Sequence, residues 1–515
     1  MVAALLASCL VVSCATSTET PQTTTSSARS PSVAADVNIE RVVLQAYRAI
    51  GDRHLFEPNF RALSTETYRG FANADPSMAL ETSDKAFTVK RDGREVLSRP
   101  TPADPADGRA WGGMLAELMA GSIEASPALQ STDRQALIRE AMTATTKQLD
   151  RNSRYADPEE ARDNRFQRDG GGGVGITVER TDDKKVVIRA VQDGSPAGKA
   201  GVQVGDQILA IDGDSMVDRP LSDVVARLRG AVGAPVAITV RHEAGGEAVL
   251  TMKRGKIIPT TVVYERREDI ALIHLTGFNS ATTENLKTAI DRARAEIGKD
   301  LAGVIIDMRS NRGGLLDQAQ TVSELFINNG TIFSTNGRHP DSKRTYRSAP
   351  SAKAADLPIV VLMNGGSASA AEIVAAALQD RGRAVVVGST SYGKGTVQTV
   401  VRLANEGELI LTWSRLQAPS GYTWNELGVL PNICTSKIVD LGQLSASSVD
   451  SSQGTLMRWH ALRNPTQQEV SDLRKICPPG DNSPERDVEI ATRLLRDRGL
   501  YAHAVQAATQ QAARH

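Results

Sequence analysis

The chain has 515 residues, of which 40% are hydrophobic and 23% are charged. This length exceeds what one hydrophobic core organises, so we expect two or three domains, and the composition excludes a wholly disordered chain and a membrane-embedded body. Lysine plus arginine number 60, as do aspartate plus glutamate, and this balance argues against a nucleic-acid partner.

The first residues are typical of an export leader. Residues 2–12 are apolar, too few to span a bilayer as a helix but suited to the hydrophobic segment of a signal. The string Val11-Val12-Ser13-Cys14 resembles a bacterial lipobox, which predicts lipidation at Cys14; Cys9 fits the pattern too but leaves too short an apolar run. We therefore expect a periplasmic or envelope protein that reaches the membrane only through a lipid anchor, with a cleaved soluble signal as the alternative.

The next two segments differ in character. Residues 15–36 are rich in Ser, Thr and Pro, which predicts a disordered tether. Residues 37–168 are predicted to be mainly helical, because apolar residues recur at spacings of three and four in 109–125 and 133–150. Residues 87–97 (FTVKRDGREVL), which precede both of these stretches, fit either a small hairpin or an exposed loop.

Residues 170–255 have the composition of a small β-rich domain, with glycine turns and one helix at LSDVVARLRG. The segment resembles a PDZ domain in GVGI at 173–176, GSPA at 194–197 and GDQIL at 205–209. The resemblance implies that a peptide with an apolar C-terminus adds as a strand beside a glycine loop that captures its carboxylate. The expected lining residues, of which the apolar ones could equally be core, are Gly173, Val174, Gly175, Ile176, Val225 and Leu228.

Residues 256–438 alternate strand-like and helical patterns. Apolar runs at 270–275, 303–308, 358–363 and 384–389 alternate with helical stretches at 282–297 and 369–380. Such alternation predicts an α/β fold with a largely parallel sheet and covering helices. Residues 439–515 are polar and periodic, and we expect a helical C-terminal extension there.

Four segments carry a resemblance to a known family. They are LDRNSRYADPEE (149–160), DMRSNRGGLL (307–316), the stretch from Pro358 to Val401, and APSGYTWNELGVLPNI (418–433). In this order, with a PDZ-like segment between the first two, they resemble the carboxyl-terminal processing peptidases, serine proteases that use lysine in place of histidine. The resemblance implies a sheet of the caseinolytic protease or crotonase type and a reaction that needs no cofactor.

The resemblance assigns a catalytic dyad. The family places its nucleophile 25 residues before the lysine, which selects Ser369 with Lys394 and leaves Ser367 two residues too far away. A serine at a helix start is usually an N-cap, but the surrounding segments favour the nucleophile. Lys394 lies in a glycine-flanked turn, and partial burial would lower its pKa enough for it to act as a base. Gln398 would orient Lys394.

The backbone N–H groups of Gly313 and Gly314 are expected to line the oxyanion site together with that of Ala370. Arg312 departs from the proline that the family has before this glycine pair, which weakens the assignment. Glu372, one turn beyond Ser369, either assists the site or merely favours the helix N-terminus.

Other chemistries find less support. Seven histidines occur, but none lies in the family segments, which argues against a histidine triad. No zinc-binding spacing is present, so no metal is expected. With Cys9 and Cys14 in the leader, Cys434 and Cys477 remain; a disulfide between them is plausible in an oxidising compartment, and two free thiols are the alternative.

The sequence therefore predicts an endopeptidase that cleaves envelope proteins near unstructured apolar C-termini, with the PDZ domain binding the tail and gating activity. An adaptor protein and a homodimer formed through the helical regions are further expectations. A catalytically inactive PDZ scaffold is the main alternative, and a thioester-handling enzyme is a third interpretation. The predicted boundaries are 1–14 for the leader, 15–36 for the tether, 37–168 for the helical region, 170–255 for the PDZ domain, 256–438 for the catalytic domain and 439–515 for the extension.

Overall fold

A computed structural model describes residues 38–350, 352–438, 440–462, 465–480 and 484–512. The leader with Cys14 and the tether lie outside the described residues. Within the described part, no helix is both long and apolar enough to cross a bilayer.

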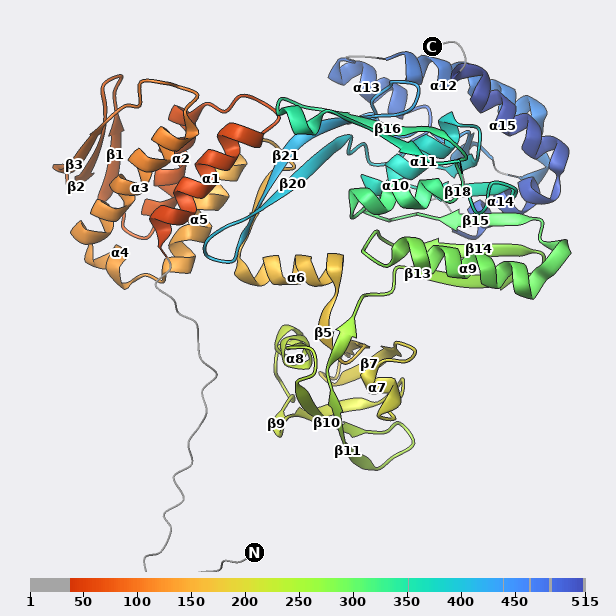
Figure 1. The fold of residues 1–515 in the computed structure, drawn as a ribbon, viewed down its shortest axis with the longest axis horizontal. Coiled ribbons are helices and arrows are strands. Elements are labelled where there is room, and N and C mark those ends of the chain that lie inside the picture. Colours follow the sequence, from red (N-terminus) through yellow and green to blue (C-terminus); the bar gives the residue numbers. More distant parts are fainter. Residues whose placement is uncertain (1–37, 351, 439, 463–464, 481–483, 513–515) are drawn as a thin grey trace, which may run out of the picture. The chain divides into compact units, whose positions relative to one another are not determined.

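The region that follows the tether combines helices with a small sheet (Figure 1). The helix α1 (Ile39–Arg53) packs on α3 (Gly108–Ala125), and α2 (Phe60–Ala72) packs on α5 (Arg134–Lys147), with the short α4 (Pro127–Ser131) between α3 and α5. The three antiparallel strands are β1 (Met78–Thr82), β2 (Ala86–Arg91) and β3 (Arg94–Pro100). Residues 87–97 thus form a hairpin, which turns at Asp92 and Gly93 with φ values of 48° and 78°. An Asp-Gly pair suits such a turn because both central residues need positive φ.

Two short elements, β4 (Arg154–Ala156) and α6 (Pro158–Asp169), lead into the PDZ-like segment. The two ends of that segment lie side by side, because β5 (Gly171–Gly173) pairs with β12 (Gly255–Ile257). The remaining elements are β6 (Ile176–Arg180), β7 (Val186–Val191), α7 (Pro196–Lys199), β8 (Gln207–Ile211), β9 (Asp214–Ser215), α8 (Leu221–Leu228), β10 (Pro235–Arg241) and β11 (Glu247–Lys253). Strands β6, β7, β8, β10 and β11 form one sheet around a core of its own.

The main sheet has the strand order β13-β14-β15-β18-β19-β22. Its strands are β13 (Val262–Arg267), β14 (Ile270–Leu275), β15 (Gly303–Asp307), β18 (Ile359–Met363), β19 (Val385–Gly388) and β22 (Ile433–Cys434). All neighbouring pairs are parallel except β13 with β14. The four predicted strands are therefore the four central ones, and the α/β fold class is confirmed.

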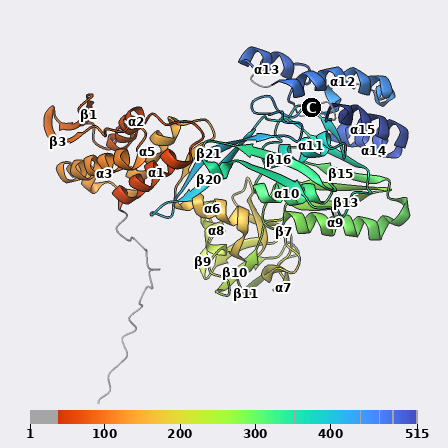
Figure 2. The ribbon, with the colours of Figure 1, turned by 45° about the horizontal axis from the view of Figure 1, so that its top comes forward.

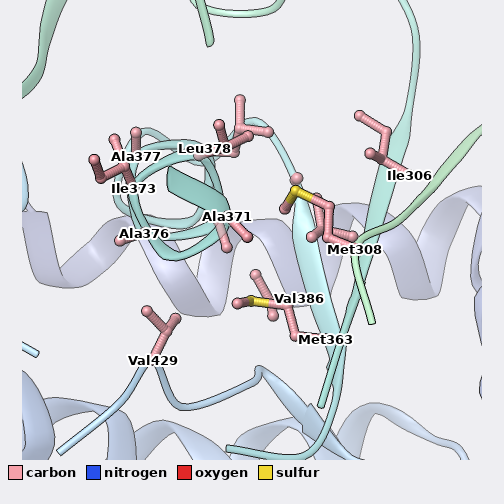
Figure 3. Packing of buried hydrophobic residues seen from close by; sticks show 14 of the residues in the cluster. Ile306, Met308, Met363, Ala371, Ile373, Ala376, Ala377, Leu378, Val386 and Val429 are labelled. Atoms are coloured by element: carbon pink, nitrogen blue, oxygen red, sulfur yellow. The ribbon is translucent and has the colours of Figure 1, made fainter. Parts of the chain in front are cut away.

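Alternate residues of these strands face two separate cores. One face packs on α9 (Thr282–Ile297), α10 (Leu316–Glu324) and α11 (Ala370–Asp380), and the other packs on α14 (Pro484–Arg496) and α15 (Arg498–Ala512). Figure 3 shows Met363 and Val386 of the sheet on the side of α11 from which Ala371 projects. Because helices cover both faces of the main sheet, its central strands are continuous apolar runs in the sequence.

A second sheet adjoins the first and was not predicted. It has the order β17-β16-β21-β20, with β16 (Gly330–Asn336), β17 (Arg344–Ser348), β20 (Thr396–Arg402) and β21 (Glu408–Gln417). All of its pairs are antiparallel. β4 also pairs with β21. A strand that precedes the PDZ-like segment in the sequence therefore joins a sheet whose other strands follow that segment.

The C-terminal extension is helical, as expected. Besides α14 and α15 it contains α12 (Ala446–Ala461) and α13 (Gln467–Arg474), and Figure 2 shows these helices grouped beside the main sheet. Cys434, at the end of β22, forms a disulfide with Cys477, which follows α13. This bond joins the extension to the sheet.

Candidate active site

Ser369 occupies the turn between a buried strand and a buried helix, since β18 ends at Met363 and α11 begins at Ala370. Its backbone has φ 57° and ψ −115°, a conformation that residues other than glycine rarely adopt and that concentrates at functional turns. The residue is half-buried. The turn thus places a serine at a helix N-terminus, where the first N–H groups have no partner within the helix.

Ser367, the competing serine, has a structural role in the same turn. It is fully buried. Its Oγ donates to the carbonyl oxygen of Met308 at 2.8 Å and accepts from the backbone N–H of Asn364 at 3.0 Å. Both hydrogen-bonding functions of this hydroxyl are therefore used inside the protein.

Lys394 lies in the loop between β19 and β20. The loop is tightly packed: a Cβ on Gly393 would approach the backbone of Glu426 to 2.8 Å. Burial is the main cause that lowers the pKa of Lys394, and the positive charge of Arg154 lowers it further. Within the described part of the chain, the Nζ of Lys394 makes no hydrogen bond or ion pair. A lysine in such surroundings loses its proton more readily than an exposed one.

Glu372 holds the serine turn and the lysine loop together from inside the protein. Its Oε2 accepts from the backbone N–H groups of Ser369 at 2.7 Å and of Lys394 at 2.9 Å. Its Oε1 accepts from the N–H of Gly393 at 2.7 Å and from the hydroxyl of Ser391. The carboxyl is fully buried, and burial raises its pKa although these donors oppose the rise. The bond to Ser369 is part of a capping box at the start of α11, and the bonds to Gly393 and Lys394 reach the lysine loop, so its contacts fit both of the roles that the sequence left open.

The glycine loop behind β15 lies directly against Ser369. Gly313 has φ 93°, and a Cβ there would approach the Cβ of Ser369 to 2.8 Å, so only glycine fits. Its N–H, however, donates to the Oδ1 of Asn311 at 2.8 Å. The N–H of Ala370 lies at the first position of α11. Gly313 is thus near the serine as expected, but its N–H is already engaged in this structure.

Gly314 lies against the segment between β14 and α9. It forms a parallel β-bridge with Phe278, and a Cβ on Gly314 would approach the carbonyl oxygen of Phe278 to 2.1 Å. Arg312, the residue that replaces the family's proline, is exposed. The exposed arginine leaves the close contact between Gly313 and Ser369 intact.

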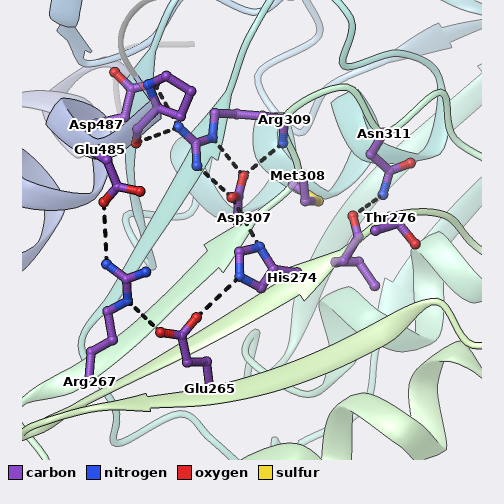
Figure 4. Close-up of polar contacts among 12 residues, drawn as sticks. Glu265, Arg267, His274, Thr276, Asp307, Met308, Arg309, Asn311, Glu485 and Asp487 are labelled. Atoms are coloured by element: carbon purple, nitrogen blue, oxygen red, sulfur yellow. Dashed lines mark hydrogen bonds and ion pairs between the residues drawn. The ribbon is translucent and has the colours of Figure 1, made fainter. Parts of the chain in front are cut away.

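An ion-pair network anchors the start of this loop (Figure 4). Arg309 donates to both oxygens of Asp307, at 2.9 and 2.7 Å, and approaches Asp487 of α14 to 3.3 Å. On the other side of Asp307, the Nδ1 of His274 lies 3.3 Å away. The C-terminal extension therefore holds the loop that contacts Ser369.

Gln398 lies on β20, close to the lysine loop, but with a different partner from the expected one. Its Nε2 donates to the Oγ1 of Thr396 at 3.0 Å, and the Nδ2 of Asn152 donates to the same oxygen at 3.2 Å. Among the described residues, no hydrogen bond joins Gln398 to Lys394.

The residues around Asp150 are the part of the site that sequence reasoning missed. Asp150 accepts from the hydroxyl of Thr412 at 2.7 Å, and Thr412 lies opposite Gln398 in the pairing of β20 with β21. The Oγ of Ser153 accepts from the backbone N–H of Thr412 at 3.0 Å and donates to the carboxylate of Asp150. The signal was present, because these residues belong to the segment LDRNSRYADPEE, but no role had been assigned within it.

All six predicted lining residues border a groove of about 600 Å³, which Phe166, Val263 and Thr276 from outside the PDZ-like segment also line. It lies between β6 and α8. Val174 and Leu228 are buried as well, so they contribute to the core and to the groove wall. Among the described residues, no cluster of His, Cys, Asp or Glu side chains is arranged to hold a metal ion.

Comparison with known proteins assigns these features to a family. The family model for peptidase family S41 matches residues 269–435, and that for the PDZ domain matches residues 164–241. A carboxy-terminal-processing protease of Bartonella bacilliformis is 40% identical over 309 residues, which cover 58% of this chain and 70% of that protein. The chain belongs to peptidase family S41. It is an S41 protease of the carboxy-terminal-processing type, and it carries a PDZ domain.

A further relative and a solved structure are also similar to this chain. The carboxy-terminal processing protease CtpA of Bacillus subtilis is 34% identical over 310 residues, which cover 59% of this chain and 65% of that protein. Among solved structures, a photosystem II D1 C-terminal processing protease is 24% identical, covers 77% of this chain and 92% of that protein, and superposes with a TM-score of 0.40.

Proposed function

We propose that this S41 protease is a serine endopeptidase in which Ser369 is the nucleophile and Lys394 the general base. The observation that carries the proposal is the shared contact with Glu372, which binds the backbone N–H groups of both residues and so fixes the two loops against each other. The lowered pKa of Lys394 supports the base role, because a neutral amine can accept the hydroxyl proton. The structural bonds of Ser367 leave Ser369 as the available hydroxyl.

The reaction follows from these positions. Lys394 takes the proton of Ser369 while Oγ attacks the scissile carbonyl, and the N–H of Ala370 stabilises the developing oxyanion together with that of Gly314. Gly313 joins them only after its N–H leaves Asn311. The protonated Lys394 then gives its proton to the leaving amine, and water releases the acyl group from Ser369. Gln398 orients Lys394 after it exchanges its bond to Thr396.

We further propose that the substrates are envelope proteins with unstructured apolar C-termini, that the PDZ groove binds the tail and gates cleavage, and that Cys14 carries a lipid. The mixed apolar and glycine lining of the groove supports a tail of this kind. The proposed domain boundaries remain those derived from the sequence, with the PDZ domain at 170–255 and the catalytic domain at 256–438.

A matched pair of serine variants tests the dyad. A folded model protein with a disordered apolar tail is incubated with the wild type, Ser369→Ala and Ser367→Ala, and the products are followed by mass spectrometry. Ser369→Ala should lose at least about 1,000-fold in kcat/KM while its melting temperature stays close to that of the wild type. Ser367→Ala should lower the stability by roughly 1–3 kcal/mol, because the N–H of Asn364 loses its acceptor, and still cleave where it is folded.

Equal cleavage by Ser369→Ala and the wild type would refute the assignment of the nucleophile. A wild type that binds the tail but cleaves nothing would instead favour the inactive PDZ scaffold. A second substrate whose tail ends in aspartate tests the preference of the groove, and it should be cleaved more slowly than the apolar tail.

A further inference from the structure

The loop that carries Lys394 rests on residues 425–428, a segment beyond β21 that we call the clamp segment. The carbonyl oxygen of Gly393 accepts from the backbone N–H of Glu426 at 2.7 Å. A Cβ on Gly395 would approach the backbone nitrogen of the first residue of the clamp segment to 2.5 Å. The two backbones are thus in direct contact on both sides of Lys394, and the position of the lysine depends on the position of the clamp segment.

Glu426, in the middle of these contacts, has a strained backbone. Its φ is 65°, in the left-handed region that is costly for a residue with a Cβ. Such a conformation persists only where the surrounding contacts enforce it. The side chain of Glu426 accepts from Gln467 at 2.6 Å and lies 3.7 Å from Arg151. These two contacts hold the carboxylate, whereas the peptide groups of the clamp segment need partners of their own.

Arg474, in the last turn of α13, supplies such partners. Its Nη1 donates to the carbonyl oxygens of Glu426 at 3.2 Å and of Leu427 at 2.7 Å. The contact is close, because a Cβ on Gly428 would approach the same nitrogen to 2.9 Å. One guanidinium nitrogen therefore fixes two successive peptide groups, one of which belongs to the strained residue.

The charge of Arg474 has no paired anion in the part of the chain that the structure describes. Its printed hydrogen bonds there go to the two carbonyl oxygens. The residue is half-buried, and burial is the main cause that lowers the pKa of its guanidinium. A cation that leaves water without a paired carboxylate is costly, and neutral carbonyl groups offset only part of that cost. Such a cost points to a role besides the stability of α13.

We infer that Arg474 is a positioning residue for the general base. It fixes the carbonyl group of Glu426, and the N–H of Glu426 fixes Gly393, the residue before Lys394. This inference rests on the proposed function of Lys394. It gives a role in the reaction to α13, which lies outside the part of the chain that matches the S41 family model.

The experiment compares the wild type, Arg474→Ala and Lys475→Ala on the model protein with the apolar tail. Arg474→Ala should lower kcat about 10- to 100-fold and leave KM within about 2-fold, because the general base is displaced while the PDZ groove is not changed. Lys475→Ala, which removes an exposed cation 2.8 Å from Asp472, is the matched control and should keep kcat. Free guanidinium at millimolar concentration should restore part of the kcat of Arg474→Ala, and an equal concentration of NaCl should not.

An arginine that only stabilises the fold gives a different result. Arg474→Ala would then have a lower melting temperature but the kcat of the wild type at temperatures at which it is folded, and guanidinium would not change its rate. That outcome would overturn the inference.

Hydrogen exchange separates this inference from the proposed function. The N–H groups of Gly393 and Lys394 are bound to Glu372, so their exchange reports on the lysine loop without any need for activity. In Arg474→Ala this loop should exchange at least about 10-fold faster, and guanidinium should slow it again, while α9 keeps its rate. Unchanged exchange with unchanged kcat would overturn the inference and leave the dyad, which the serine variants test, in place. Faster exchange with unchanged kcat would overturn the proposed role of Lys394 and the inference with it.

Discussion

The backbone N–H groups of Ser369 and Lys394 donate to one and the same oxygen atom, Oε2 of Glu372. Two loops that follow different strands of the main sheet are thereby held at a fixed separation by a carboxyl group that water does not reach. A proton transfer between serine and lysine needs such a fixed separation, because small displacements of reacting groups cost large factors in rate.

Glu372→Gln should therefore damage both the fold and the reaction. An amide has a single acceptor oxygen, and its NH₂ group would face N–H donors that the carboxyl now satisfies. We expect the free energy of unfolding to fall by about 2–4 kcal/mol and kcat to fall at least about 100-fold. Urea denaturation and steady-state kinetics check this. Glu284→Gln, in the exposed first turn of α9, is the control and should leave both within error; a Glu372→Gln enzyme as stable and active as the wild type would contradict the expectation.

Lys394→Met should raise stability at neutral pH while it abolishes cleavage. The folded protein lowers the pKa of Lys394 below its unfolded value, first through burial and then through Arg154. The stability cost of the charged amine is thus fully present below the folded pKa and disappears as the pH rises toward the unfolded pKa near 10.4. The stability gained by Lys394→Met should be larger at pH 6 than at pH 10, as measured by denaturation at both. A gain that does not depend on pH would show that the lysine is not desolvated.

Gly313→Ala should block the site by direct crowding. The new Cβ would lie 2.8 Å from the Cβ of Ser369, so we expect kcat/KM to fall at least about 100-fold. Gly298→Ala is a matched control, because Gly298 also has positive φ, 69°, but open space around it. It should cost about 1 kcal/mol in stability and leave cleavage intact. Similar kinetic losses in both variants would mean that backbone strain, rather than contact with Ser369, explains the effect.

Reduction of the disulfide between Cys434 and Cys477 should loosen the lysine loop. The hydroxyl of Thr390 donates to the carbonyl oxygen of Cys477 at 2.6 Å, and that of Ser389 donates to the carbonyl oxygen of Gly480 at 2.9 Å. Since the bridge closes a sequence separation of 43 residues, we expect a loss of about 3–4 kcal/mol. We also expect a lower kcat.

The measurement compares thermal unfolding and cleavage with and without reductant. The variant with both cysteines changed to serine should behave like the reduced wild type and should not respond to reductant. If reductant lowers the stability of the wild type but leaves kcat unchanged, the lysine loop does not depend on the segment after α13.

Sequence reasoning succeeded where pattern alone decides structure. The apolar runs at 270–275, 303–308, 358–363 and 384–389 are the four central strands, because strands buried on both faces leave an uninterrupted apolar signature. Motif segments and their spacing singled out Ser369, Lys394 and the PDZ lining residues, and the roles assigned to them stay predictions.

What the sequence did not predict depends on contacts between distant residues. The antiparallel sheet β17-β16-β21-β20 was missed because its order does not follow the chain and because β17 and β20 are partly exposed, so they lack a continuous apolar run. Glu372 could not be distinguished from an ordinary residue of a helix start, since its donors Gly393 and Lys394 lie on another loop. The pairing of His54 with Asp150 spans 96 residues, and no periodicity encodes it.

The contacts of the lysine loop with Cys477 and Gly480 have a consequence for how the enzyme is made. A protein leaves the ribosome from its N-terminus, and segments fold as they emerge. The turn with Ser369 is synthesised more than a hundred residues before the segment that supports the lysine loop. With the proposed roles of Ser369 and Lys394, a chain made only as far as the serine turn would have its nucleophile but not the segment that supports its base, so it could not cleave before that segment has been synthesised.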